Sequence, residues 1–349
     1  MPFYRWDGTE LVLGEVSRWD GTALQPGVVK QHPWTTVEPP PPGPITLLDG
    51  GAPLRPSVEL VVDGGAPDTT VAAGSLIDSL STPAYVGHRF GRFQWHENTY
   101  YAANQFFAAF PSATSVVGEC DLQLLSDGDT MVLNHDSTVT YAGTPNVAIS
   151  SLTPAQWDTV TMPPYVAGQP QQPAAFWDHP SYPSKSVAAL YGNSRILMPE
   201  LKNTGCRVPL MDWIDANDAY GSVIVQYAVY STSAYSTHIL PMASAGIATA
   251  VICYSLPGGG SIPSLATMAS DGVYAIVVST SFLAANPTLL ANAHAEGIKV
   301  HTFNSNTASA VTAQAELGVD GIMSDAPTAS FPATMPPPPS TSSFDGGEP

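Results

Sequence analysis

The chain of 349 residues has few charged residues and few cysteines. Charged residues make up 11% of the sequence, and 11 Lys and Arg stand against 29 Asp and Glu, which gives a formal net charge of −18. Eleven basic side chains against this excess of acidic ones cannot create the positive field that attracts nucleic acid or anionic lipid. We therefore expect neither as a partner. Cys120, Cys206 and Cys253 have neither a paired nor a metal-ligand spacing, and we expect them to pack as small apolar residues.

Long hydrophobic runs are missing as well. No apolar stretch reaches the length of a membrane-spanning helix, and the first residues, "MPFYRWDGTELVLGEV", lack the basic and apolar regions of a signal peptide. We therefore expect no transmembrane segment and no export by the ordinary signal route. The hydrophobic content of 44% is nevertheless enough for a globular protein with a sizeable core.

Residues 1–80 consist of short repeats and proline. "RWDGT" occurs at 5–9 and 18–22, "LLDGGAP" at 47–53 is echoed by "VVDGGAP" at 61–67, and "EPPPPGP" separates the two pairs. Asp-Gly between short apolar runs favours hairpins, and a proline run favours an extended spacer. We expect an N-terminal attachment arm of small β-hairpins with a Pro-rich linker, the alternative being an unstructured leader. Residues 331–349 are rich in Pro and Ser and are predicted to form a disordered tail.

Between these ends, strand-like runs alternate with helix-like stretches. The apolar runs are 84–88, 115–122, 196–201, 222–228, 249–254, 273–278, 298–303 and 320–324, and helix-like stretches include "PLMDWIDANDAY", "SFLAANPTLLANAHAEG" and "TASAVTAQAELG". Eight strands alternating with helices predict an α/β fold, a (β/α)8 TIM barrel, over residues 81–330. Residues from about 137 to 195 break the alternation and are predicted to form a rim insertion that covers the site.

Polar side chains collect where the predicted strands end, which is the catalytic face of such a barrel. The candidates are His88 and Arg89, Glu119 and Asp121, His135 and Asp136, and Glu200 and Lys202. Three carboxylates suit a hard divalent cation rather than zinc, Arg and Lys suit a phosphate, and two histidines can act as acid and base near neutral pH. Asp325, which follows the last strand, is expected to have a structural hydrogen-bonding role.

Four separated motifs carry a family resemblance. "HRFGRFQWHENTYYAANQFF", "GECDLQLLSDGDTMVLNHD", "LMPELK" and "GVDGIMSDAP", spread over residues 84–327, resemble the glycerophosphodiester phosphodiesterases, which are metal-dependent barrel enzymes. The resemblance implies that His88 and His135 are the general acid/base pair and that Glu119, Asp121 and Glu200 bind one Mg2+ or Ca2+ ion. It also implies that Arg89 and Lys202 bind the phosphate. Glu97 and Asn98 would help to shape the mouth of the site.

The sequence departs from the family pattern at several positions. Phe90 replaces a glycine, so we expect Gly91 to supply the backbone freedom one residue later. Pro199 stands inside a strand beside a metal ligand and predicts local distortion. His301 stands where the family commonly has tryptophan, which predicts a changed wall around the alcohol part of the substrate.

The resemblance implies hydrolysis of a glycerophosphodiester to an alcohol and glycerol phosphate. The repeats and Pro-rich spacers also resemble minor tail proteins of actinobacteriophages. This resemblance implies that the protein is part of the virion tail and contacts other tail proteins through the arm. Its substrate would then be a glycerol-phosphate polymer or deacylated lipid of the host envelope. The alternatives are a cytoplasmic location, a catalytically inactive barrel that serves adhesion, and a phospholipase-D-like enzyme that acts on intact lipid.

Overall fold

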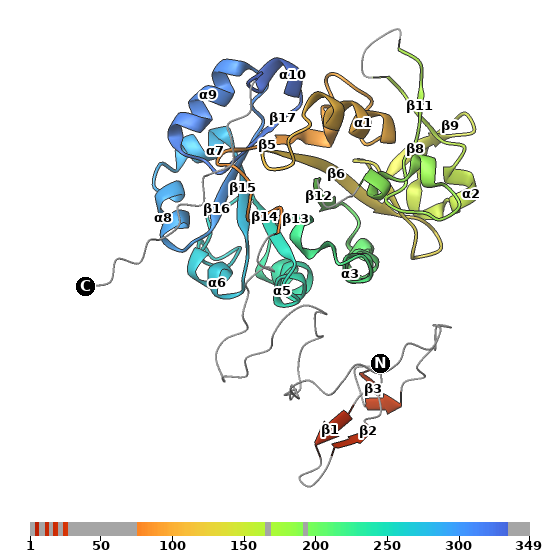
Figure 1. Ribbon diagram of the computed structural model, residues 1–349, viewed down its shortest axis with the longest axis horizontal. Helices are drawn as coiled ribbons and strands as arrows, with labels where there is room; N and C mark the ends of the chain where they lie inside the picture. Colours follow the sequence, from red (N-terminus) through yellow and green to blue (C-terminus); the bar gives the residue numbers. More distant parts are fainter. Residues whose placement is uncertain are drawn as a thin grey trace, which may run out of the picture. The chain divides into compact units, whose positions relative to one another are not determined.

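The computed structural model describes residues 75–164, 169–190 and 195–333, together with four short strands near the N-terminus (Figure 1). The predicted Pro-rich linker, the repeats at 47–53 and 61–67, and the predicted tail from residue 334 onward lie outside the described residues. Residues 1–66 and 67–349 are separate compact units.

The N-terminal unit contains two short hairpins. Strand β1 (Tyr4–Trp6) pairs with β2 (Leu11–Leu13), and β3 (Ser17–Trp19) pairs with β4 (Leu24–Pro26), both antiparallel. The Asp-Gly of each "RWDGT" copy falls in the sequence between the two strands of one pair. The expected hairpins are therefore confirmed.

The second unit is a closed barrel of eight parallel strands with helices around it (Figure 1). In chain order the barrel strands are β5 (Ala84–Gly87), β6 (Val116–Leu124), β12 (Ile196–Leu201), β13 (Ile224–Val229), β14 (Ala248–Cys253), β15 (Ala275–Ser279), β16 (Lys299–Phe303) and β17 (Gly321–Ser324). Pairing between β5 and β17 and between β6 and β12 completes the ring. The predicted (β/α)8 barrel is confirmed, and each predicted strand overlaps an observed one.

The strands read as continuous apolar runs because helices cover their outer faces while side chains fill the barrel interior. Val86, Val117, Met198 and Ile224 belong to the cluster inside the barrel, and a larger cluster lies between strands and helices. The segment 75–80, which the sequence assigned to the arm, also contributes to the interior, where Ile77 is buried.

The helices begin at residues suited to capping. The Thr99 hydroxyl accepts from the backbone N–H of Ala102 at the start of α1, and Thr307 does the same at α9. The predicted helix-like stretch at 281–297 forms two helices, because Pro287 between them has no N–H to donate. The helices are α1 (Tyr100–Ala109), α2 (Pro154–Trp157), α3 (Arg207–Ala216), α4 (Thr232–Ala234), α5 (Leu240–Ser244), α6 (Leu265–Ser270), α7 (Thr280–Ala285), α8 (Leu289–Ala295), α9 (Ala308–Leu317) and α10 (Pro327–Ser330). No described helix is both long and apolar enough to cross a membrane.

The insertion folds around a small core of its own. It follows β7 (Met131–Leu133), which pairs antiparallel with β6, and contains two hairpins: β8 (Thr138–Tyr141) with β9 (Thr144–Ala148), and β10 (Thr161–Met162) with β11 (Gln172–Pro173). Trp157 and Phe176 are fully buried in this core, and the Trp157 indole donates to the carbonyl oxygen of Ala175.

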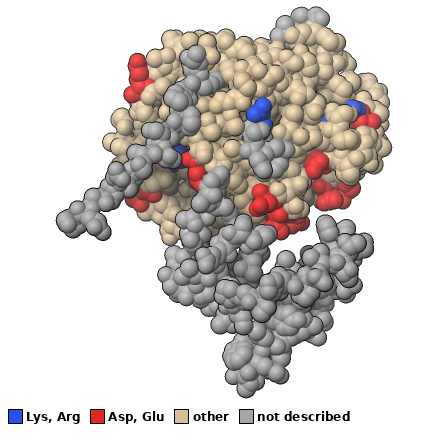
Figure 2. Space-filling view, viewed as in Figure 1, with Lys and Arg blue, Asp and Glu red and all other residues tan. Residues whose placement is uncertain are grey.

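Charge is thinly spread over the surface. Figure 2 shows a face on which acidic side chains outnumber basic ones and broad uncharged areas separate them. The three cysteines are buried and unpaired, as expected. Burial raises the pKa of the Cys206 and Cys253 thiols to about 12, so these residues behave as small apolar groups.

His301 should make the stability of the fold depend on pH. Its ring is buried at the bottom of the barrel against Tyr274, and burial lowers its pKa from 6.5 to about 4. Because the unfolded chain binds the proton more readily, stability should fall by about 3 kcal/mol as pH drops from 6.5 to 4. Above pH 6.5 this contribution is constant.

The measurement is urea unfolding at several pH values for the wild type and His301→Leu. The leucine variant should lose less stability between pH 6.5 and 4 than the wild type, because it carries no group to protonate. Equal losses in the two proteins would show that the buried imidazole does not cause the acid sensitivity.

Candidate functional site

The site begins with a left-handed turn directly after β5. His88 is followed by Arg89, Phe90 and Gly91 with φ angles of 51°, 60° and 93°. The backbone N–H of Arg89 donates to Oε2 of Glu119 at 2.7 Å, which holds the turn in this conformation. We expected Gly91 to adopt the conformation that the family's glycine allows, and it does have a positive φ. Arg89 and Phe90 also adopt the left-handed region, which costs about 1 kcal/mol or more at each residue.

Packing of Phe90 offsets this strain. Its side chain is fully buried and lies edge-on to the ring of Phe107, with centroids 6.2 Å apart. Gly118 in β6 makes room for it, since a Cβ atom at that position would lie 2.6 Å from the Phe90 ring. A phenylalanine in place of the family's glycine is thus matched by a glycine on the neighbouring strand.

Three carboxylates meet on β6 and β12. The parallel register places Glu200 opposite Asp121 and Met198 opposite Glu119, so the three side chains project from adjacent positions. One oxygen from each of Glu119, Asp121 and Glu200 lies within 4.8 Å of the others, and all three residues are buried. This is the donor set of a hard cation.

Pro199 affects the opposite edge of β12. The pairing of β12 with β6 is regular, whereas its pairing with β13 is a contact between Glu200 and Gln226 and an isolated bridge between Leu197 and Val223. Proline cannot donate to a neighbouring strand, so this thinning is the expected distortion. It leaves Glu200 in place, level with Gln226.

The carboxylates influence one another's protonation. Burial raises the pKa of Glu119 well above its ordinary value, and the charges of Asp121 and Glu200 raise it further. Burial and Asp121 also raise the pKa of Glu200. Asp121 is buried as deeply, but Lys202 and Arg89 lower its pKa below the ordinary value. The cluster thus carries more negative charge than its environment stabilises, which favours binding of a cation.

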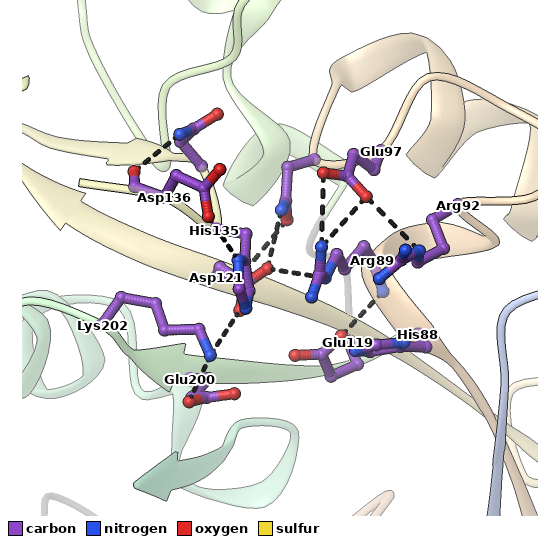
Figure 3. Close-up of polar contacts among 12 residues, drawn as sticks. His88, Arg89, Arg92, Glu97, Glu119, Asp121, His135, Asp136, Glu200 and Lys202 are labelled. Carbon is purple, nitrogen blue, oxygen red and sulfur yellow. Dashed lines mark hydrogen bonds and ion pairs between the residues drawn. The ribbon is translucent and has the colours of Figure 1, made fainter. Parts of the chain in front are cut away.

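Two basic side chains lie beside the carboxylates (Figure 3). Lys202 Nζ lies 2.7 Å from Glu200 Oε1 and 3.4 Å from Asp121 Oδ1. Arg89 Nε lies 3.3 Å from Asp121 Oδ2, and its Nη1 donates to both oxygens of Glu97 at 3.1 and 3.3 Å. Glu97 therefore holds the Arg89 guanidinium, and it is not among the described residues that line the cavity.

Each of the two candidate histidines has a carboxylate partner. His88 Nδ1 lies 2.5 Å from Asp325 Oδ1, and Asp325 also accepts from Asn304 and Asn306. Burial raises the pKa of Asp325, but the hydrogen bonds and charge of these partners, His88 foremost, lower it to about 2. His135 Nδ1 lies 2.8 Å from Asp136 Oδ1 at a more exposed position. These pairs leave Nε2 of both rings for a reacting group.

A cavity of about 180 Å³ joins these groups. Its lining includes six of the eight residues selected from the sequence, namely His88, Arg89, Glu119, His135, Glu200 and Lys202. The remaining lining residues are Gln226, Ile252, Tyr254, Val277, Phe303, Asn304 and Met323. No described residue from 137 to 190 lines this cavity. Trp157 and Phe176 pack in the insertion's own core, whereas Trp177 and Val187 pack in the main core, where Trp177 contacts Trp213 of α3. Coverage of the site by the insertion stays a prediction.

Two further expectations need correction. His301 does not line the cavity; Phe303, two residues later on the same strand, forms that wall. Asn98 is fully buried and does not lie at the mouth of the site. Its side-chain amide donates to Asp121 Oδ2 at 2.8 Å and accepts from the Asp121 N–H. Asn98 therefore fixes a carboxylate of the cluster.

Three features of the site were not predicted from the sequence. Asp325 pairs with His88, and the signal for it is that "SDAP" follows a strand on the catalytic face. Gln226 donates to Glu119 Oε1 at 2.8 Å and stands out as the polar residue in "VIVQYAV". Tyr254 lines the cavity and follows its strand by one residue.

Fold and site together define a (β/α)8 barrel with an acidic cation-type site, two histidines and two basic side chains at the carboxyl ends of its strands. Residues 261–329, from the loop before α6 through α10, match the family model described as the glycerophosphoryl diester phosphodiesterase family. The family resemblance seen in the motifs is thereby confirmed. No curated protein sequence matches the chain.

Solved structures share the fold. A protein of Silicibacter pomeroyi described as a glycerophosphoryl diester phosphodiesterase is 20% identical, with a TM-score of 0.55 over 71% of this chain and 91% of that one. A glycerophosphodiester phosphodiesterase of Agrobacterium tumefaciens is 17% identical, with a TM-score of 0.52 over 70% and 97%. An Oleispira antarctica phosphodiesterase in complex with the product sn-glycerol-3-phosphate is also 17% identical, with a TM-score of 0.50 over 70% and 94%. The barrel thus has the fold of these solved structures.

Proposed function

We propose that the protein is a metal-dependent phosphodiesterase that hydrolyses glycerophosphodiesters to an alcohol and glycerol phosphate. The observation that carries the proposal is the buried cluster of Glu119, Asp121 and Glu200, which shares one cavity with Arg89, Lys202 and two histidines. The product complex of the Oleispira antarctica relative supports glycerol phosphate as the product.

The residues fit one divalent cation, Mg2+ or Ca2+. Glu97 and the three carboxylates of the cluster outnumber the two cations Arg89 and Lys202, which leaves an excess of negative charge. Asp121 Oδ1 is buried, with Lys202 Nζ 3.4 Å away and no hydrogen-bond partner. A divalent cation would offset this excess. When bound, the ion would stabilise negative charge on the phosphate oxygens and increase the acidity of the attacking hydroxyl.

The basic side chains bind the phosphate. Arg89 is held by Glu97 and Asp121, so its guanidinium is already oriented toward the cavity and loses little freedom when a phosphate oxygen arrives. Lys202 reaches the cavity from the end of β12 and can move between Glu200 and a phosphate oxygen.

The two histidines move protons. Asp325 accepts from Nδ1 of His88, which fixes the tautomer with a free Nε2 that can take the proton of the attacking hydroxyl or give one to the leaving oxygen. Asp136 holds His135 in the same way, and in Figure 3 His88 lies next to Glu119 whereas His135 lies next to Asp121. One ring serves as base and the other as acid.

The test is hydrolysis of glycerophosphocholine and of a glycerol-phosphate polymer after EDTA treatment and after addition of Mg2+ or Ca2+. Activity should fall to background with EDTA and return with one of the two ions. Glycerol phosphate should accumulate in step with the released alcohol. Turnover that is unaffected by EDTA, or no turnover by a folded protein with either ion, would contradict the proposal; cleavage of intact lipid alone would favour the phospholipase-D-like alternative.

We also propose that the N-terminal arm attaches the enzyme to a phage tail, so that it acts on glycerol-phosphate polymers or deacylated lipid of the host envelope. The paired hairpins at the two "RWDGT" copies support a repeated attachment unit. Mass spectrometry of purified virions should detect the chain together with tail proteins. Its presence in the host cytoplasm and absence from virions would contradict this assignment.

A further inference from the structure

Two stacked tyrosines stand at the mouth of the catalytic cavity. In the barrel register Val229 lies opposite Cys253, so Tyr230 and Tyr254 are neighbours at the ends of β13 and β14. Their ring centroids are 5.3 Å apart and their planes differ by 3°. Tyr254 lines the cavity, and Tyr230 extends the stack outward.

Exposure of these rings is unusual for side chains of their size. Tyr230 is 67% exposed and Tyr254 53% exposed, and Leu256, in the loop after β14, is 46% exposed. Together they make up three of the five large apolar side chains that the described part of the chain leaves exposed. A cluster of exposed apolar surface beside a catalytic cavity marks a binding surface.

The cavity itself has room for the reacting group alone. Its volume of about 180 Å³ lies below the roughly 300 Å³ that begins the range of pockets for larger ligands. Phosphate and a three-carbon glycerol unit fit this space, so a larger alcohol portion has to leave the cavity along its wall. Tyr254 is the part of that wall that continues onto an exposed aromatic surface.

The geometry indicates what this surface binds. The two rings stack on each other, so each offers a ligand one flat face, whereas recognition of a quaternary ammonium group uses several rings that surround the cation. A flat aromatic face matches the flat C–H face of a sugar or cyclitol ring. The net charge of −18 argues against a nucleic acid as the flat ligand.

We propose that Tyr230 and Tyr254 form a platform for a polyhydroxylated ring, a sugar or a cyclitol, carried by the alcohol portion of the glycerophosphodiester. This inference rests on the proposed function and specifies its substrate class. Tyr254 contacts the part of the alcohol nearest the phosphate, and Tyr230 contacts the ring farther out.

The experiment compares three substrates that share the glycerophosphate unit. Glycerophosphoinositol carries a ring, glycerophosphoglycerol carries none, and glycerophosphocholine carries a quaternary ammonium. Tyr230→Ala should lower kcat/KM for glycerophosphoinositol about tenfold and change it less than twofold for the other two. Tyr230→Phe, which retains the ring, should keep most of the activity on glycerophosphoinositol.

A matched aromatic variant locates the effect. Tyr141 lines a separate cavity of about 530 Å³ in the insertion, so Tyr141→Ala should leave all three activities unchanged. A selective loss with Tyr141→Ala but not with Tyr230→Ala would move the ring site to the insertion and overturn the proposal. Equal loss on all three substrates with Tyr230→Ala, or a loss confined to glycerophosphocholine, would also overturn it.

Failure of the proposed function can be distinguished from failure of this inference. If the wild type hydrolyses none of the substrates, saturation-transfer NMR measures binding of glycerophosphoinositol and glycerophosphoglycerol instead. Saturation of the inositol ring protons that is lost in Tyr230→Ala would support the platform without activity. Inositol signals that are equal in the two proteins would overturn it.

Discussion

Replacement of His88 with alanine should lower kcat by about 10³-fold while the fold is retained, because the change removes one of the two proton-transfer groups. The ring lies at the mouth of the barrel and its side chain is 15% exposed, so its removal leaves no large cavity in the core. Activity should be measured with saturating metal on glycerophosphocholine, with circular dichroism and thermal unfolding as checks of structure.

Two further variants test whether the loss of activity comes from the proton-transfer role of His88. Asp325→Asn keeps the size of the partner but removes the acceptor charge that fixes the His88 tautomer, so it should lower kcat strongly while KM changes little. His294→Ala, on the exposed side of α8, should leave turnover unchanged. A His88→Ala protein with normal kcat would assign proton transfer elsewhere and contradict the role given to this histidine.

Glu119→Gln should abolish metal-dependent turnover, with a loss of about 10³-fold or more, and should also remove stabilisation by the metal. The glutamine oxygen can still accept from the Arg89 N–H, and Gln226 can rotate so that its unpaired Oε1 accepts from the new amide. The variant therefore keeps the turn and removes one charge. Because burial and two neighbouring carboxylates raise the pKa of Glu119, its neutral replacement should not destabilise the metal-free protein.

Thermal unfolding with and without Mg2+ or Ca2+ separates these effects from simple damage to the fold. The wild type should gain in Tm as metal is added, by mass action on the folded state, and the variant should not. Asp127→Asn, which changes an exposed carboxylate in the turn before β7, serves as the matched control and should keep the metal-induced shift. A variant whose Tm still rises with metal would show that Glu119 is not a ligand.

The turn after β5 connects backbone strain to the chemistry. Arg89 and Phe90 hold left-handed angles because Glu119 accepts from one N–H and Gly118 leaves space for the Phe90 ring. These two residues of β6 therefore hold Arg89, the proposed phosphate ligand, and one of them, Glu119, is itself a proposed cation ligand. Strain at such a position is retained where the surrounding contacts over-determine it, which is the case here.

The sequence by itself determined the barrel and the kinds of residue in its site. Eight apolar runs could be recognised because parallel strands buried on both faces are continuously hydrophobic, and a change to helical periodicity separates them. Glu119 and Asp121 could be assigned to one face because side chains alternate along a strand. The four motifs then brought His88, His135, Glu200 and Lys202 into the same site.

Tertiary structure decided what depends on contacts between distant segments. The partner of His88 is 237 residues away, and only closure of the barrel between β17 and β5 brings Asp325 beside it. The same closure puts His301 below the cavity and Phe303 in its wall, and the strand register places Tyr230 against Tyr254. A local pattern fixes the direction of a side chain along its own strand, but which side chains meet is set by how the strands pair, because the closed sheet makes neighbours of residues that the sequence keeps apart.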